Sequence, residues 1–363
     1  MNVTHLITTI CRGGAETQLL TLAREQARFG HEVTVYFLKG DPELEKEFLD
    51  SGVRVKNTLG SKTFLQQILV FRNEVRRSNS IIHAHLPKSE LIASIARSSN
   101  KLIISRHNSE PFFPGAPTFI SRFLSKLVSL RSSGCISISN AVKNYLISNK
   151  ELVSSKKHWV VEYGFNPSAK IHERKDIPKS SVITFGTVSR LVPQKDLTTL
   201  LIGFGKFTSK KPSNLLIVGK GPEKINLQTF SKHLNIDQHV SWLDQTSNVY
   251  ETMSQMDVFC LTSKYEGFGL VLLEAMQSEL PIIAANNSAI SEVLGDSYPY
   301  LFTTSDTADL LEKMELLTSE RHRKDAIAYL QERLKKFSPF VMATKIDAIY
   351  MECLNQIPQN KSL

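Results

Sequence analysis

Two glutamates eight positions apart, Glu266 and Glu274, are the side chains in this sequence whose spacing most clearly suggests chemistry. Gly267 and Gly269 lie between them, and an apolar segment begins at Leu270. The pattern predicts Glu266 in a loop and Glu274 about one turn inside the following helix. Glycines let loop amides and a helix N-terminus approach a phosphate, whose negative charge the helix dipole favours. The two carboxylates would then suit sugar hydroxyl groups.

The same helix also has a simpler interpretation. Glu274, Gln277 and Ser278 recur at the spacing of an ordinary solvent-exposed helix face, and this pattern alone favours that interpretation. However, the stretch from Glu266 to Glu274 resembles the Glu-x7-Glu signature of retaining family 4 glycosyltransferases. The resemblance implies an α/β protein of GT-B architecture, with two Rossmann-like domains facing each other across a deep cleft.

Two segments that follow predicted strands in the second half resemble other parts of that family. Arg190 and Lys195 flank the loop after the predicted strand 182–188, and resemble the Arg and Lys that hold the donor pyrophosphate. Gly219 lies in a strand-turn-helix segment that matches a family motif, so its backbone is expected near the nucleotide.

The first half contributes a glycine turn and a histidine. Gly13 and Gly14 separate the first predicted strand from a helix, which fits either a tight turn or a phosphate-facing loop. In the family a glycine loop here faces the donor diphosphate, and a histidine matching His107 contacts the donor sugar. His83 and His85 are interpreted as structural, because no third metal ligand lies at a recognisable spacing.

The resemblance implies transfer of a glycosyl group from a nucleotide-diphosphate sugar to a hydroxyl acceptor, with retention of the anomeric configuration. No metal or other cofactor is expected, since the sequence has no Asp-x-Asp motif and fixed cations can neutralise the leaving diphosphate. Glu266 would hold donor-sugar hydroxyls, and Glu274 the ribose hydroxyls. The catalytic residues implied are Glu266, His107, Arg190 and Lys195; the donor-binding residues implied are Gly13, Gly14, Gly219, Gly267, Phe268, Gly269, Leu270 and Glu274.

The sugar, the base and the acceptor are left open, with a lipid-linked or polysaccharide precursor as the expected glycan acceptor. Two other classes of protein are also compatible with the sequence. A GT-B nucleotide-sugar epimerase would recruit several acid/base residues instead of a phosphate-binding cation pair. A non-catalytic nucleotide-sugar-binding subunit would bind donor without turnover.

A chain of 363 residues exceeds one usual hydrophobic core and predicts two domains. Strand-like runs alternate with amphipathic helical stretches, as in parallel sheets covered by helices. The predicted parts are an acceptor-binding domain at 1–165, a linker at 166–180, a donor-binding domain at 181–338 and a terminal helix at 339–363. In the family that helix crosses back to the first domain. Strands in the first half are predicted at 3–8, 32–38, 53–55, 81–83, 102–104, 134–138 and 159–162.

The charge of the chain is uneven. Residues 1–170 hold 23 Lys and Arg against 13 Asp and Glu, whereas residues 171–363 hold 21 against 22. The basic first half suggests an acidic partner, either anionic lipid or a phosphorylated acceptor, and not nucleic acid, because no recognition motif is present.

No apolar run approaches the ~20 residues of a membrane helix. We therefore expect a cytoplasmic protein with at most reversible attachment to the inner face of the membrane. In the predicted helix around Phe119 to Arg131, the apolar stripe is expected to pack on the sheet, leaving a cationic rim for a membrane surface. Phe112 and Phe113 are candidate shallow anchors.

Overall fold

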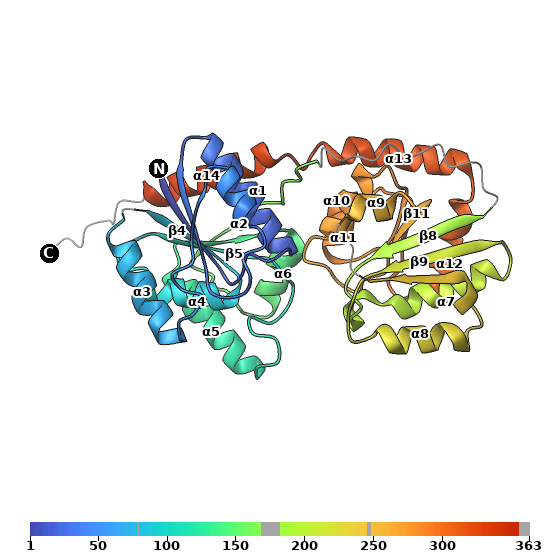
Figure 1. Cartoon of the computed structure of the whole chain (residues 1–363), viewed down its shortest axis with the longest axis horizontal. Coiled ribbons are helices and arrows are strands. Elements are labelled where there is room, and N and C mark those ends of the chain that lie inside the picture. The colour runs from blue at the N-terminus through green and yellow to red at the C-terminus, as the bar shows by residue number, and fades with distance from the viewer. Residues whose placement is uncertain (79, 168–181, 245–247, 356–363) are drawn as a thin grey trace. The chain divides into compact units, whose positions relative to one another are not determined.

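The computed structural model describes residues 1–78, 80–167, 182–244 and 248–355. The chain forms two compact units, Met1–Asn166 with Phe337–Leu363, and Pro167–Lys336 (Figure 1). Each unit is built on one parallel sheet, so the predicted α/β class with two Rossmann-like domains is confirmed. Nearly all of the predicted linker, 166–180, lies outside the described residues.

Unit 1 contains a seven-stranded sheet in the order β3-β2-β1-β4-β5-β6-β7. Its strands are β1 Asn2–Ile7, β2 Glu32–Phe37, β3 Arg54–Lys56, β4 Ile81–His85, β5 Leu102–Arg106, β6 Gly134–Ser137 and β7 Lys157–Val160. Its helices are α1 Gly14–Arg28, α2 Glu45–Asp50, α3 Phe64–Arg76, α4 Pro87–Ala96, α5 Thr118–Arg131, α6 Asn140–Ser148 and α14 Pro339–Leu354. Every predicted strand of the first half is present, but β4 extends further than predicted, which places His83 and His85 inside the sheet.

Unit 2 contains a six-stranded sheet in the order β10-β9-β8-β11-β12-β13. Its strands are β8 Ile183–Val188, β9 Ser213–Val218, β10 Val240–Leu243, β11 Val258–Leu261, β12 Ile282–Ala285 and β13 Leu301–Phe302. Its helices are α7 Leu197–Thr208, α8 Lys224–His233, α9 Val249–Met253, α10 Leu270–Gln277, α11 Ser288–Leu294, α12 Thr307–Leu316 and α13 Glu320–Leu334, with short 3-10 turns at Pro193–Lys195 and Asp237–His239.

The strand order reverses direction once in each sheet. β8 lies between β9 and β11, and β1 lies between β2 and β4. In parallel α/β sheets, the loops at the carboxyl ends of the strands flanking such a switch point form the usual ligand site. The topology therefore singles out the loops after β8 and β11 in unit 2, and after β1 and β4 in unit 1.

The last helix, α14, is part of the core of unit 1 although it follows unit 2 in the chain. Ser338 accepts a hydrogen bond from the Val341 N–H, and Pro339 occupies the first turn, where its missing N–H costs nothing. The helix lies against α1 (Figure 1). It buries Ile346 and Tyr350 in the cluster that contains the sheet residues. Burying each such side chain stabilises the fold by about 1.5–3 kcal/mol, so unit 1 depends on α14.

Helix α5 differs from its predicted packing. Val128 is buried, but Phe119 and Phe123 are 73% and 66% exposed, so the prediction that the whole apolar stripe packs on the sheet is wrong. Phe112 is only 1% exposed, and the Arg106 guanidinium carbon lies 4.4 Å from its ring centroid. Phe112 is thus part of the interior and not a shallow membrane anchor. Among the described helices, none is both long and apolar enough to span a membrane.

Candidate active site

The loop after β8 is bonded to the loop after β11, because the two strands are neighbours. The Gln194 side-chain amide donates to the Tyr265 carbonyl at 2.8 Å, and the Lys264 N–H donates to the Gln194 carbonyl at 2.8 Å. The Thr262 hydroxyl donates to the Lys195 carbonyl at 2.9 Å. These contacts hold the predicted phosphate-binding loop against the predicted glutamate loop.

Lys195 and Glu266 form an ion pair at this junction. Lys195 Nζ lies 2.5 Å from Glu266 Oε1, and the two side chains are only 12% and 9% exposed. Ser263 donates its hydroxyl to the same oxygen at 2.7 Å. The Ser288 hydroxyl accepts from the Glu266 N–H at 2.9 Å and donates to the Glu266 carbonyl at 2.7 Å. Glu266 is therefore fixed through both its carboxylate and its backbone.

Arg190 has a different environment from Lys195. Its side chain belongs to an exposed residue in the loop after β8. Within the residues that the structure describes, Arg190 makes no ion pair or hydrogen bond through its guanidinium. The loop thus offers one cation already paired with a carboxylate and one that is available to an anion.

The glycine turn after β9 is dictated by close backbone packing. Gly219 has φ +146°, and a Cβ there would lie 1.8 Å from the Ser189 carbonyl oxygen. A Cβ at Gly221 would lie 2.2 Å from the Leu191 carbonyl oxygen, and the Leu191 N–H donates to the Lys220 carbonyl at 2.8 Å. Glycine is required at Gly219 because a side chain would force the loops after β8 and β9 apart.

Glu274 lies on the fifth residue of α10, as predicted. Gly269 precedes this helix with φ +86°. Burial raises the pKa of Glu274 to about 7, and its carboxylate has no hydrogen-bond or ion-pair partner in the described part of the chain. Gln277 is only 6% exposed, so the interpretation of this face as solvent-exposed is wrong. A partly buried carboxylate with a raised pKa and no protein partner is a candidate ligand-binding group.

In unit 1, the Gly13 turn and His107 are linked through two residues that sequence reasoning missed. Glu16 is buried in the first turn of α1, and burial raises its pKa. The pKa of Tyr163 is raised chiefly by burial and further by the charge of Glu16. The Tyr163 hydroxyl lies 2.5 Å from His107 Nδ1. No motif marks Glu16 or Tyr163, because only the fold places them beside His107.

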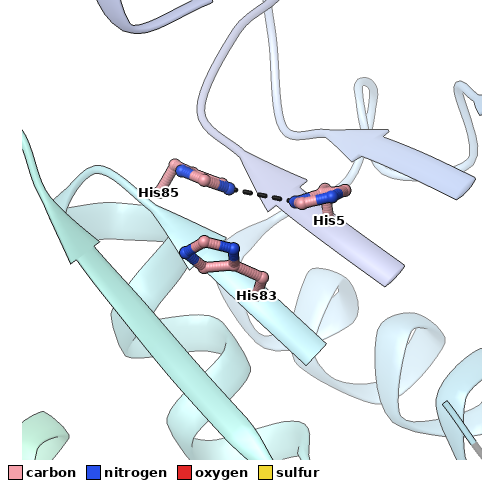
Figure 2. Close-up of side chains that lie close together, drawn as sticks. All are labelled: His5, His83 and His85. Carbon is pink, nitrogen blue, oxygen red and sulfur yellow. Dashed lines mark hydrogen bonds between the residues drawn. The ribbon is translucent and has the colours of Figure 1, made fainter. Parts of the chain in front are cut away.

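His107 ends a chain of buried imidazoles. Its Nε2 lies 3.2 Å from His85 Nδ1, and His85 Nε2 lies 3.1 Å from His5 Nδ1, the bond drawn in Figure 2. His5 Nε2 lies 2.8 Å from the Gln26 amide oxygen, which can only accept. With neutral rings, His5, His85 and His107 therefore all carry their proton on Nε2, and the Tyr163 hydroxyl donates to His107 Nδ1.

Burial keeps these rings neutral. It lowers the pKa of His5 to about 4 and that of His107 to about 3, and it lowers the pKa values of His83 and His85 well below the usual range. A neutral His107 can hydrogen-bond a ligand but cannot supply a positive charge near neutral pH. Each neutral ring therefore donates its Nε2 proton in the same direction, from His107 to His85, from His85 to His5 and from His5 to Gln26.

The cluster of His5, His83 and His85 also raises the question of a metal. Their ligand nitrogens lie within 4.8 Å of one another (Figure 2), so the fold supplies a third histidine that spacing along the sequence does not indicate. However, His83 bonds Tyr350 and Ser105 at 2.6 and 2.7 Å, and both nitrogens of the other two rings are also occupied. The geometry favours a hydrogen-bonded core, since a metal would have to displace these bonds.

A cavity of about 100 Å³ in unit 1 lies beside His107, and Glu90 and Arg106 also line it. Arg106 Nε donates to Glu90 Oε2 at 2.7 Å. Glu90 Oε1 and Arg106 Nη2 are buried and have no partner among the described residues. Leu86, which also lines the cavity, has the unusual φ of +72°. Strained backbone and unpaired polar atoms around one cavity are typical of a ligand site.

Comparison with known proteins identifies the family of the chain. The model for Glycosyltransferase Family 4 matches residues 12–168, and the model for Glycosyl transferases group 1 matches residues 169–333. Together the two matches span nearly the whole chain.

Three individual proteins illustrate the likeness. The chain is 30% identical over 178 residues to an N-acetyl-alpha-D-glucosaminyl L-malate synthase of Bacillus anthracis, covering 48% of this chain and 46% of that protein. It is 26% identical over 359 residues, 93% of this chain and 94% of the relative, to a Campylobacter jejuni enzyme named GalNAc-alpha-(1->4)-GalNAc-alpha-(1->3)-diNAcBac-PP-undecaprenol alpha-1,4-N-acetyl-D-galactosaminyltransferase. The solved structure of HepE from Anabaena, in complex with UDP and glucose, has a TM-score of 0.79 at 18% identity and covers 97% of this chain and 100% of HepE. The last likeness concerns the fold alone.

Proposed function

This chain belongs to family 4 of the glycosyltransferases and has the GT-B fold, and we propose that it is a retaining enzyme that uses a nucleotide-diphosphate sugar. The observation that carries the proposal is the junction of Lys195, Glu266 and Arg190 at the switch point of unit 2. It combines one available cation, one paired cation and a fixed carboxylate within two bonded loops.

The ion pair suggests how the donor is held. Lys195 neutralises Glu266 in the structure. A donor diphosphate bound by Arg190 and Lys195 would share or replace that pairing, leaving Glu266 to accept hydrogen bonds from hydroxyls of the donor sugar. Charged donors to phosphate oxygens form strong hydrogen bonds, which explains the use of two cations.

The reaction breaks the bond between the anomeric carbon and the diphosphate oxygen, and forms a bond to the acceptor oxygen, whose proton is released. Negative charge grows on the departing diphosphate, so cations already in place lower the barrier. Arg190 and Lys195 supply that stabilisation in this proposal without a metal ion. Turnover should then persist in EDTA, and a strict requirement for added manganese or magnesium would contradict the proposal.

Glu274 is proposed to bind the ribose hydroxyls of the nucleotide. Its partly buried carboxylate has no partner in the described residues, and two adjacent hydroxyls could donate hydrogen bonds to it. The backbone of Gly267, Phe268, Gly269 and Leu270 at the start of α10 is proposed to face the phosphate or the sugar, where the helix dipole favours negative charge.

His107 is proposed to hydrogen-bond the donor sugar as a neutral ring, with Gly13 and Gly14 facing the diphosphate. Its Nε2 is occupied by His85, so Nδ1 is the nitrogen available to a ligand once the Tyr163 hydroxyl turns away. The adjoining cavity, with Glu90 Oε1 and Arg106 Nη2 unpaired, is proposed to receive part of the acceptor.

The acceptor is proposed to be a lipid-linked or polysaccharide precursor. The Campylobacter jejuni relative supports this choice, because its name specifies an undecaprenyl-diphosphate glycan. We further propose that the protein is cytoplasmic and attaches reversibly to an anionic membrane surface through unit 1. The exposed Phe119 and Phe123 of α5 support this attachment.

The experiment that tests the function begins with thermal-shift screening against UDP, GDP and ADP sugars, with UDP-glucose included because HepE was solved with UDP and glucose. The selected donor is then incubated with candidate lipid-linked glycans, and NMR of an early mixture reads the new anomeric configuration. We expect stabilisation by one nucleotide class and a retained configuration. An inverted product would refute the proposed mechanism, and donor binding without turnover on any acceptor would favour a binding subunit.

A further inference from the structure

Unit 1 has a second, larger cavity away from His107. It has a volume of about 480 Å³ and is lined by five lysines, Lys126, Lys143, Lys150, Lys156 and Lys157. Lys157 and His158 begin β7, whereas His107 follows the carboxyl end of β5, so this lysine pocket lies toward the opposite edge of the parallel sheet. No acidic side chain is among its lining residues.

Four of the five lysines, all except Lys157, form no ion pair among the described residues. Lys156 donates to the Ser132 carbonyl at 2.9 Å, and Lys157 pairs with Glu352. Within the described ranges, Lys126, Lys143 and Lys150 form neither an ion pair nor a hydrogen bond through their ammonium groups. Like charges around one concavity repel each other, so a bound anion would stabilise the arrangement.

His158 is the one histidine among the lining residues of the pocket. The pKa of His158 is lowered to about 4, chiefly by burial and further by the charges of Lys143 and Arg106. His158 Nε2 lies 2.7 Å from the Ser137 hydroxyl, so the ring is held in place. Because this imidazole is neutral, the positive charge of the pocket comes from its lysines alone.

Exposed apolar side chains adjoin the lysine pocket. Phe123 and Leu130 are exposed on α5, and they flank Lys126 at the spacing of one helix face. Ile147 of α6 is exposed and lines the pocket itself. Apolar groups beside lysine ammonium groups suit the boundary of a bilayer, where the former enter the acyl region and the latter meet phosphates.

We infer that the lysine pocket binds a phosphate group, supplied by the headgroup of an anionic phospholipid. The inference extends the membrane attachment proposed above by assigning its contact to a defined site. The volume lies in the range of about 300–1,000 Å³ typical of small-molecule sites, which is enough for a glycerophosphate headgroup. A soluble phosphate ester has the same chemistry, so the test must separate the two sources.

The first arm measures flotation with vesicles of phosphatidylglycerol and phosphatidylcholine at low salt. The test variant is Lys126→Gln/Lys143→Gln/Lys150→Gln, which removes the three lining lysines that have neither an ion pair nor a hydrogen bond. Each basic residue near an anionic surface raises partitioning to the membrane by about tenfold or less, so removing three of them should lower partitioning by roughly 100-fold. The matched control, Lys39→Gln/Lys56→Gln/Lys62→Gln, removes three exposed lysines of unit 1 that do not line the pocket, and should retain most binding.

The second arm measures binding of glycerol phosphate by calorimetry. The inference is supported if the wild type binds both the vesicles and, weakly, glycerol phosphate, and if the pocket variant loses the glycerol phosphate binding. Glycerol phosphate binding without vesicle binding overturns the lipid source. Equal loss of flotation in both variants, or unchanged flotation in the pocket variant, overturns the site. Thermal stabilisation by the nucleotide sugar should be unaltered in both variants, so a failed lipid test is distinguishable from a failed transferase assignment.

Discussion

Alanine replacements of Arg190 and Lys195 should weaken donor binding similarly but should differ in their effect on folding. Arg190 is exposed and unpaired in the described residues, so Arg190→Ala should remove the proposed phosphate contact and little else. Lys195 also neutralises Glu266 at 2.5 Å, in a pair with side chains only 12% and 9% exposed. Lys195→Ala therefore leaves a largely buried carboxylate with Ser263 as its remaining side-chain partner.

The magnitudes follow from these environments. A charge-assisted hydrogen bond contributes about 1.5–3 kcal/mol, so each variant should bind the nucleotide about 10- to 100-fold more weakly. Arg190→Ala should change the free energy of unfolding by less than about 0.5 kcal/mol. Lys195→Ala should lower it by about 1–3 kcal/mol, less than the about 3–5 kcal/mol of a fully buried pair, because Ser263 and some solvent remain. Adding Glu266→Gln should recover part of this loss.

Calorimetric titration with the nucleotide selected by the donor screen measures the binding change. Urea unfolding followed by fluorescence measures stability, in a Trp159→Phe background that leaves Trp242 of β10 as the sole tryptophan and reports on unit 2. Unchanged nucleotide affinity in both alanine variants would refute the phosphate-binding role. Equal stability of Lys195→Ala and wild type would refute the structural contribution of the ion pair.

Three other predictions use different features. Burial raises the pKa of Glu274 to about 7, so the stability associated with its protonation is fully present below about pH 4.5 and is lost as pH rises through 7. Urea unfolding should show the free energy of unfolding of the wild type falling by about 1–3 kcal/mol over this pH range, and Glu274→Gln should lack that fall. Gly219→Ala should destabilise unit 2 by about 2–5 kcal/mol, because its Cβ would lie 1.8 Å from the Ser189 carbonyl oxygen at φ +146°; an unchanged urea midpoint would contradict this packing. Tyr163→Phe removes the hydroxyl that occupies His107 Nδ1, so it should shift the His107 imidazole resonances in NMR, whereas identical spectra would show that the hydroxyl does not bond the ring.

The local sequence pattern determined much of the fold and the location of the candidate site. Alternating strands and helices predict parallel sheets, and in such sheets the loops at the strand carboxyl ends carry ligand groups. For this reason Glu266, Arg190 and Lys195 could be placed at one edge before any contact was known. The position of Glu274 inside α10 also followed, because helix periodicity and the preceding glycines are local signals.

The tertiary structure alone decided which side chains meet. Ser288 bonds Glu266 from 22 residues away, and His5 joins His83 and His85 across two neighbouring strands, although nothing in the spacing pairs them. Tyr163 reaches His107 in the same way, from the segment after β7. These contacts depend on strand order, which a local pattern cannot encode.

The tertiary structure also decided which apolar side chains are buried. The apolar residues of α5 have the period of a packed helix, yet Phe119 and Phe123 remain exposed, because no other element of unit 1 covers that face in the described residues. Helix periodicity states which residues share a face, and the placement of neighbouring elements decides whether that face meets protein or solvent. The same reason applies to α14, whose pattern specified only an amphipathic helix while the fold placed it in the core of unit 1.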